Sequence, residues 1–224
     1  MGGHAGGAVA SKVAVDTAVA SVEKGVSLGA ALQAANRAVG AKAAGDRLTT
    51  DELHANIGLL FGAGHETTTN LIGNGLLALH RAPAQWQRLK DDPSLIPGAI
   101  EELLRFDSSV QMTGRATLAE VEVGGVTLPA SESLIMLLGA ANRDPAHYTD
   151  PETLDVGRQN IRPMSFGGGI HHCLGAQLAR LEGELVFAAL IERFPTLELP
   201  EKDTPDWRQN FTLRGLNKLP AVWH

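Results

Sequence analysis

The single cysteine of the chain, Cys173, stands where residue types and spacing favour metal binding. Gly167, Gly168 and Gly169 precede it, and a segment of strongly helical character follows it. Glycine permits backbone conformations closed to other residues and lets the chain approach a ligand closely. A helix start directs unpaired N–H groups and the positive end of its dipole at the sulfur, which favours the thiolate that binds metal. These features are compatible with a thiolate ligand, but for an isolated cysteine they favour a buried structural cysteine at the start of a helix.

A zinc site is a competing interpretation for His171, His172 and Cys173. Three adjacent residues cannot easily surround one tetrahedral ion, and the sequence has no second cluster of ligands at a suitable spacing. We therefore favour a lone sulfur ligand over zinc.

A second candidate group is Ala-Gly-His-Glu-Thr-Thr-Thr at residues 63–69, within a long segment of helical periodicity. Gly64 and the three threonines together cost about 1–2 kcal/mol relative to better helix formers. The Thr67 hydroxyl can compete for the carbonyl of Ala63 and bend the helix. The pattern predicts a local opening with room for a flat cofactor, beside which Glu66 and Thr67 supply an acid and a hydroxyl. A helix that merely tolerates its threonines is the alternative.

Glu102 and Arg105 are three residues apart and share one face of a predicted helix. An exposed pair of this kind contributes only about 0.2–0.5 kcal/mol and is common. Spacing alone therefore predicts an ordinary surface pair.

The string from Phe166 to Arg180 resembles the heme-binding loop of the cytochrome P-450 family, of the soluble bacterial type. The pattern Phe-Gly-x-Gly-x-His-x-Cys-Leu-Gly, followed by Ala and Arg, is matched at Phe166, Gly167, Gly169, His171, Cys173, Leu174, Gly175, Ala179 and Arg180. Residues 63–67 are similar to the family's oxygen-activation motif, Ala-Gly-x-Glu/Asp-Thr, and residues 102–105 to its Glu-x-x-Arg motif. The resemblance extends from residue 45 to residue 224.

This resemblance implies heme b (iron protoporphyrin IX) as cofactor, with Cys173 as the ligand of the iron. It implies that Thr67 hydrogen-bonds dioxygen and that Glu66 belongs to the proton-delivery path. Glu102 and Arg105 would form a buried ion pair with a third arginine, for which Arg158 is the first candidate and Arg162 the second.

Further contacts follow from the same resemblance. Arg115 and His171 would pair with the heme propionates, and a solvated surface arginine is the alternative for Arg115. The remaining expected cofactor contacts are Ala63, Gly64, Phe166, Gly167 and Gly175. The expected substrate contacts are Val110, Gln111, Phe211 and Thr212.

The activity that the resemblance implies is that of a heme-thiolate monooxygenase, which inserts one oxygen atom from O2 into an apolar small organic substrate. A ferredoxin or a flavin reductase would supply electrons, because no Gly-x-Gly-x-x-Gly run follows a predicted strand in this chain.

Family members carry a longer region ahead of the long helix, which covers one side of the heme and the substrate. Residues 1–44 do not resemble it, so we expect the amino-terminal half to be missing or replaced. The alternative function is a non-catalytic, truncated scaffold that binds heme weakly or not at all and self-associates as a homo-oligomer.

The elements that must position these residues are mostly helices. We expect a long central helix from Thr50, as its N-cap, to about Leu79, helices from Pro83 and Pro97, and one after Cys173. We expect the apolar stripe of this last helix to lie in the core, and its residues are Leu174, Leu178, Leu181, Leu185 and Ala188. A hairpin around Gly124-Gly125 and a strand at 134–138 complete the pattern.

These elements predict a mainly α fold with small β-sheets, a truncated cytochrome P-450 fold. Residues 1–44 would form an alanine-rich helical segment, and residues 45–224 the heme-binding region.

Composition narrows the function further. The chain has 19 basic and 25 acidic residues, a net charge of −6, so no broad basic surface suggests nucleic acid. No apolar run reaches membrane-spanning length, and the amino terminus does not resemble a secretion signal. One cysteine cannot form an internal disulfide, which fits a cytoplasmic location.

Overall fold

The computed structural model describes residues 49–224, and the predicted alanine-rich segment at residues 1–44 lies outside them. Within the described range, contacts divide the chain into two compact units. The smaller unit contains residues 49–66 and 166–179, and the larger unit contains residues 67–165 and 180–224. The boundary expected between residues 44 and 45 stays a prediction.

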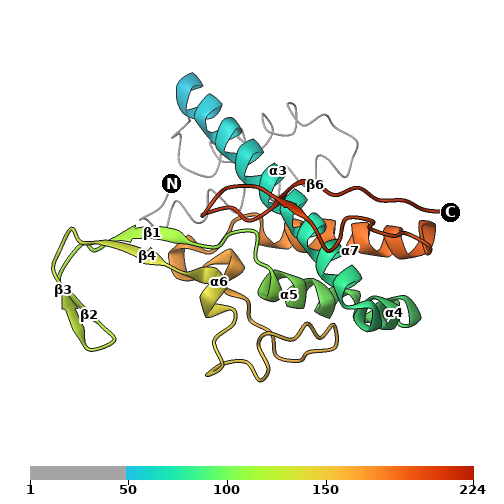
Figure 1. The fold of residues 1–224 in the computed structure, drawn as a ribbon. Helices are drawn as coiled ribbons and strands as arrows, with labels where there is room; N and C mark the ends of the chain where they lie inside the picture. Colours follow the sequence, from blue (N-terminus) through green and yellow to red (C-terminus); the bar gives the residue numbers. More distant parts are fainter. Residues whose placement is uncertain (1–48) are drawn as a thin grey trace. The chain divides into compact units, whose positions relative to one another are not determined.

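Helices dominate the described residues, as predicted (Figure 1). They are α3 (Thr50–Arg81), α4 (Pro83–Asp91), α5 (Ile96–Phe106), α6 (Leu138–Ala141) and α7 (Ala176–Arg193). Short 3-10 turns occupy Pro93–Leu95, Met164–Phe166 and Gly169–His171. No helix in this described range is both long and apolar enough to cross a bilayer.

The N-cap of α3 is Thr49, and the prediction of Thr50 was wrong by one residue. The Thr49 hydroxyl accepts from the N–H of Glu52 at 3.3 Å, while the Glu52 carboxylate accepts from the N–H of Thr49 at 2.8 Å. These reciprocal bonds are a capping box, for which Thr-x-x-Glu is the sequence signal. The main-chain bond from Thr49, and then its hydroxyl bond, lower the pKa of Glu52.

The core of the larger unit forms where side chains of α5 and α7 contact α3. A Cβ atom added at Gly75 of α3 would lie 2.9 Å from Leu103 Cδ1 and 3.1 Å from Phe187 Cζ. The missing side chain therefore permits this close packing. The most deeply buried apolar side chains of the larger unit include Leu71, Leu77, Leu79, Leu89, Ile100, Leu103 and Phe187.

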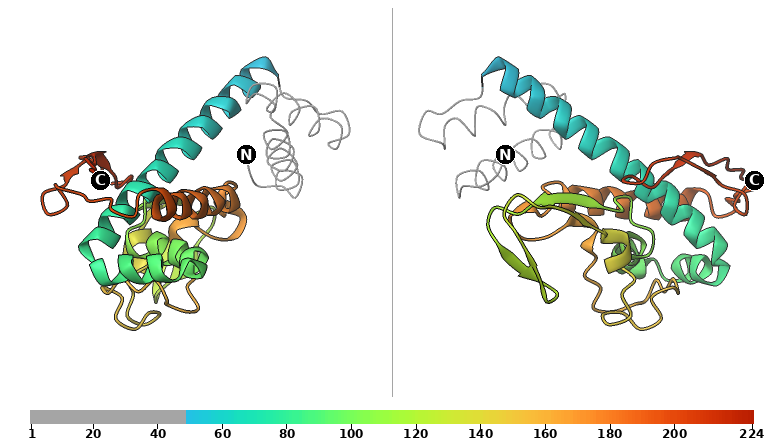
Figure 2. Two further views of the ribbon diagram at one scale, coloured as in Figure 1. Left: turned by 90° about the vertical axis from the view of Figure 1, so that its right-hand side faces the viewer. Right: turned by 60° about the vertical axis from the view of Figure 1, so that its left-hand side comes forward.

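The strands after α5 form two antiparallel pairs. The predicted hairpin is confirmed, and the following strand is present but ends at Met136 instead of at residue 138. β1 (Thr113–Ala116) pairs with β4 (Ser133–Met136), and β2 (Val121–Val123) pairs with β3 (Val126–Leu128). Gly124 and Gly125 form the turn between β2 and β3, both at positive φ. Figure 2 shows β2 and β3 as a ribbon that extends beyond β1 and β4. β5 (Asp206–Trp207) and β6 (Leu216–Lys218) form a third pair near the carboxyl terminus.

The predicted burial of one stripe along α7 was wrong. Leu181 and Leu185 are 45% and 62% exposed. The opposite face of the helix is buried instead, through Gly183 and Phe187. Both faces of α7 carry apolar residues, so helical periodicity could not indicate which face finds a partner.

Candidate functional site

In the smaller unit, residues 166–175 form a closed loop that leads into α7. The main-chain N–H of Cys173 donates to the carbonyl of Phe166 at 2.8 Å and closes this loop. Gly167 and Gly169 have φ values of +65° and +61°, in the left-handed region that favours glycine. Cys173 is a free, exposed cysteine, and α7 begins three residues later at Ala176.

The donor chemistry of this loop fits a heme iron. No group of three or more His, Cys, Asp or Glu side chains in residues 49–224 is arranged to hold a metal ion. Cys173 would therefore be a single sulfur ligand, which suits an iron whose other ligands are supplied by a porphyrin. Its apolar neighbour Ile170 is 84% exposed and is available to cover a flat apolar group.

The two histidines of the loop have different surroundings. His171 is the exposed last residue of the 3-10 turn. The ring of His172 lies 6.3 Å from that of Phe166, tilted by 51°. The expected contact of His171 with a propionate stays a prediction.

The oxygen-activation motif lies within α3, which continues unbroken through residues 63–69. The local opening predicted there is therefore not present in the helix as described. The helix stays intact because the free-energy cost of three threonines is small compared with the tertiary packing of the second half of α3. A Cβ atom added at Gly64 would meet no atom within 4 Å, so the helix surface beside this residue is open.

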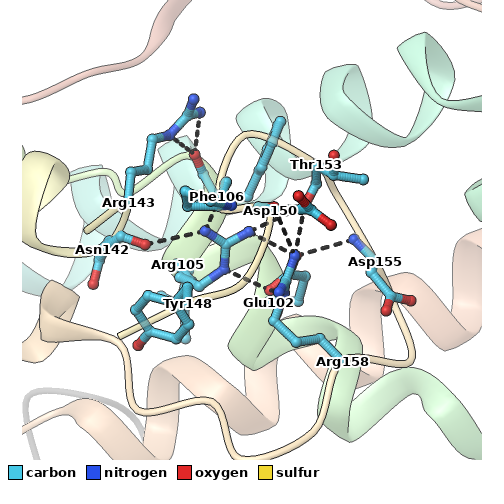
Figure 3. Close-up of polar contacts among 12 residues, drawn as sticks. Glu102, Arg105, Phe106, Asn142, Arg143, Tyr148, Asp150, Thr153, Asp155 and Arg158 are labelled. Atoms are coloured by element: carbon cyan, nitrogen blue, oxygen red, sulfur yellow. Dashed lines mark hydrogen bonds and ion pairs between the residues drawn. The ribbon is translucent and has the colours of Figure 1, made fainter. Parts of the chain in front are cut away.

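In the larger unit, Glu102 and Arg105 form a buried ion pair on α5, and Arg158 joins it (Figure 3). Arg105 Nε donates to Glu102 Oε2 at 2.7 Å, and its Nη2 donates to Oε1 at 2.8 Å. Arg158 Nε donates to the same carboxylate at 3.1 Å, and so does the N–H of Asp155 at 3.0 Å. The side chains of Glu102 and Arg105 are 0% exposed.

The guanidinium of Arg105 uses all five of its N–H donors. Two bonds go to Glu102, and three go to the carbonyls of Asn142 at 3.0 Å, Pro151 at 2.8 Å and Thr153 at 3.3 Å. A buried charge is tolerated when it is paired and hydrogen-bonded in this way. The network thus fastens α5 to the long loop after α6 (Figure 3). Arg162, the second candidate for the third arginine, is exposed, and its carbonyl accepts from Tyr148.

Arg115 lies in β1, opposite Leu134 of β4. Its Nη1 donates to Thr113 Oγ1 at 3.1 Å and to the carbonyl of Gly114 at 2.7 Å. The guanidinium is therefore held against its own strand. Its expected pairing with a propionate stays a prediction.

The two segments predicted to contact substrate are paired through their main chains. Val110 forms an antiparallel bridge with Leu213, and the N–H of Gln111 donates to the carbonyl of Thr212 at 2.8 Å. Gln111 and Phe211 line a pocket of about 350 Å³. Sequence reasoning missed its other polar and aromatic residues, Trp207, Arg208, Asn210 and Arg214.

Arg214 is held between a carboxylate and an aromatic ring. Its Nε donates to Asp107 Oδ1 at 2.6 Å, and its guanidinium carbon lies 3.7 Å from the centre of the Trp207 ring. Burial raises the pKa of Asp107, and the charges of Arg214, Arg143 and Arg81 oppose that rise. Desolvation therefore outweighs the attraction of the arginines.

Ser109 connects the pocket segments to α3. Its hydroxyl donates to the main-chain carbonyl of Thr67 at 2.9 Å, and its own carbonyl accepts from the N–H of Arg214 at 2.8 Å. Asn74 of α3 adds a bond from its Nδ2 to the carbonyl of Arg214 at 3.0 Å. No pattern in the sequence indicates these contacts between distant residues.

Comparison with known proteins places these features in a family. The Cytochrome P-450 family matches residues 27–221. A putative cytochrome P-450 133B2 of Xylella fastidiosa is 50% identical over 184 residues, which are 82% of this chain and 46% of that protein. A vitamin D(3) 25-hydroxylase of Pseudonocardia autotrophica is 49% identical over 180 residues, which are 80% of this chain and 45% of that protein.

The fold is also similar to solved structures. The tirandamycin C-bound monooxygenase TamI superposes with a TM-score of 0.79 at 42% identity, over 86% of this chain and 48% of that chain. The described residues thus have a partial cytochrome P-450 fold, and the chain spans about half the length of the curated relatives it matches. On the evidence of the cysteine loop, the fold and these relatives, the chain belongs to the cytochrome P-450 family.

Proposed function

We propose that this chain acts as a heme-thiolate monooxygenase, which inserts one oxygen atom from O2 into a small organic substrate. The observation that carries the proposal is the closed, glycine-shaped loop that presents Cys173 as a single exposed sulfur ligand. The names of relatives support it, since one is a vitamin D(3) 25-hydroxylase and another a monooxygenase. Heme b, when bound, would supply the activation of dioxygen.

The residues of the chain would then have distinct tasks. Cys173 would hold the iron, and Arg115 and His171 would pair with the propionates. Glu66 would carry a proton, and the Thr67 hydroxyl would donate a hydrogen bond. The cofactor would contact Ala63, Gly64, Phe166, Gly167 and Gly175, and the three glycines would permit its close approach.

The remaining assignments are also proposals. Val110, Gln111, Phe211 and Thr212 would orient the substrate and exclude water from it. The Glu102, Arg105 and Arg158 network would hold the larger unit rigid. Electrons would come from a ferredoxin or flavin reductase, and the cytoplasmic location stays a prediction.

The first test is reconstitution of the full chain with hemin, followed by a carbon monoxide difference spectrum of the reduced protein. We expect the absorption band of a thiolate ligand. Cys173→Ser should abolish this band, whereas His172→Ala, a neighbouring exposed side chain that can bind metal, should keep it. An unchanged spectrum of Cys173→Ser would refute the ligand assignment.

The second test addresses Thr67 through oxygen consumption with a generic redox partner. Thr67→Ala should leave the spectrum intact and lower the amount of product formed per O2 consumed. Thr69→Ala, an exposed neighbour in the same helix, is the control and should not change that ratio. If heme binds but no oxygen is consumed, heme binding stands and the monooxygenase is abandoned.

A second candidate function is a non-catalytic scaffold that self-associates. The exposed stripe of Leu181 and Leu185 on α7 favours this function, because the burial of apolar side chains at an interface lowers the free energy. Size-exclusion chromatography with in-line absorbance distinguishes the two. A colourless oligomer after hemin treatment supports the scaffold, and a protein that carries heme supports the enzyme.

A further inference from the structure

A hydrogen bond from outside α3 reaches the main chain of Thr67. The Ser109 hydroxyl donates to the Thr67 carbonyl at 2.9 Å, and both residues belong to the larger unit. In an α-helix this carbonyl lies opposite the main-chain N–H four residues later, which here is that of Leu71. A carbonyl oxygen has two lone pairs, so it can accept from the helix and from Ser109 together. Thr67 therefore receives support that the helix alone does not provide.

The bond lies at the point where α3 becomes buried. Residues 61–65 are exposed, whereas Thr68, Asn70 and Leu71 are buried. A helical segment with few buried contacts opens more readily than one that is packed. The hydrogen bond at Thr67 therefore holds the helix where its exposed part meets its packed part.

Ser109 is itself held in place, as an anchor must be. Ser108 and Ser109 are only 1% and 6% exposed. The Ser109 carbonyl accepts from the N–H of Arg214, in the carboxyl-terminal loop at residues 208–215, at 2.8 Å. Four residues before Ser109, Arg105 holds the last turn of α5 through the buried ion pair. The segment that presents the Ser109 hydroxyl to α3 therefore has little freedom to move.

The neighbouring Ser108 shows a more local way to satisfy a buried hydroxyl. Its Oγ donates at 2.8 Å to the carbonyl of Val110, two residues later in the same segment. Ser109 instead donates to a residue 42 positions earlier in the chain. The two serines are therefore a matched pair, in which one hydroxyl supports its own segment and the other supports α3.

We propose that Ser109 is a positioning residue for Thr67. Its hydroxyl fixes the carbonyl group of Thr67, whose carbon is bonded to the same Cα as the side chain, and so limits where the Thr67 hydroxyl can lie. A misplacement of about 1 Å can cost on the order of 100-fold in rate, so this restriction matters for the chemistry. The consequence for oxygen activation rests on the proposed function. The anchoring of the helix does not.

Amide hydrogen exchange of the full chain, without hemin, tests the anchor. Ser109→Ala removes one buried hydrogen bond, so the Leu71 amide should exchange about fivefold faster relative to the Ile100 amide, a buried reference in α5. Ser109→Thr keeps a hydroxyl and should restore the slow exchange. Ser108→Ala, the matched control, should leave it unchanged, and circular dichroism checks that all three variants fold. Unchanged exchange in Ser109→Ala, or an equal increase in Ser108→Ala, would overturn the proposal.

Oxygen consumption by the hemin-loaded chain, with styrene as an apolar probe, tests the positioning role. Ser109→Ala should keep the thiolate absorption band and lower the amount of styrene oxide formed per O2 consumed, as Thr67→Ala does. Ser109→Thr should restore this ratio, and Ser108→Ala should keep it. Faster exchange at Leu71 with an unchanged ratio would show that Ser109 does not position Thr67. A wild type that consumes no oxygen refutes the proposed function instead, and the exchange rates then decide whether Ser109 anchors the helix.

Discussion

The two compact units differ in how completely they bury the side chains of their characteristic motifs. In the larger unit, the Glu102 carboxylate and the Arg105 guanidinium are fully buried and fully hydrogen-bonded. In the smaller unit, Cys173 is exposed, and so are Phe61 on α3 at 65% and Ile170 in the loop at 84%. The half of α3 in the larger unit is mostly buried, and the half in the smaller unit is not.

The buried ion pair that supports the fold lies in the larger unit, and the cysteine proposed to bind the iron lies in the smaller unit. The larger unit satisfies its buried charges with its own residues, so its packing needs no further partner there. The residues proposed for heme binding lie among apolar side chains that are open to water. Covering such side chains is favourable by about 25 cal/mol per Å². A flat apolar cofactor is a suitable cover.

The largest effect is expected from neutralising the buried carboxylate. Glu102→Gln keeps the shape and removes the charge that balances Arg105 and Arg158, so we expect a loss of about 3–5 kcal/mol in the free energy of unfolding. Glu101→Gln is the matched control on the next residue. Its partner, Arg180, is partly exposed, so the loss should be about 0.2–1 kcal/mol. Urea unfolding measures both, and equal losses would contradict the comparison.

The features that could be predicted from the sequence are those whose residues are close together along the chain. The cysteine loop and the Glu102 and Arg105 pair depend on local spacing, and their positions could be found directly. The burial of that pair could not, since three-residue spacing is the same in an exposed pair. The exposed face of α7 and the contact of Asp107 with Arg214 depend on packing between distant segments, which periodicity does not encode.

The second prediction compares two glycines of α3. Alanine normally stabilises a helix by about 1 kcal/mol over glycine. At Gly75, however, the new methyl group would press on Leu103 and Phe187, so we expect a net loss of about 1–3 kcal/mol. At Gly58 nothing lies within 4 Å, so Gly58→Ala should be neutral or stabilising. Thermal unfolding of both variants decides, and a stabilised Gly75→Ala would show that the core is looser than described.

The third prediction concerns pH. Burial raises the pKa of Asp107 in the folded chain above its ordinary 3.8. At a pH between the ordinary pKa and the raised pKa, the folded chain therefore binds more protons than the unfolded chain. The free energy of unfolding therefore decreases as pH rises through that window. Asp107→Asn lacks this dependence, and its stability relative to the wild type should increase from about pH 4 to pH 7. Urea midpoints at both pH values test it, and a constant or falling difference would argue against a raised pKa.

The smallest effect on stability is expected at the cysteine proposed to bind the iron. Cys173 is exposed, so Cys173→Ser should change the free energy of unfolding by less than about 0.5 kcal/mol. Urea unfolding without hemin measures this change. A loss of several kcal/mol in the free energy of unfolding would mean that the sulfur supports the fold, which would contradict the difference drawn between the two units.

Within the larger unit, Ser109 links the carboxyl-terminal loop to α3 through hydrogen bonds. One side chain and its own carbonyl join the main chain at residue 67 to that at residue 214, so the carboxyl-terminal loop and the helix act as a single linkage. A displacement of the loop would therefore strain or break the hydrogen bond between Ser109 and the carbonyl of Thr67. The Ser109 side chain would in this way connect any movement of the loop to the main chain of Thr67.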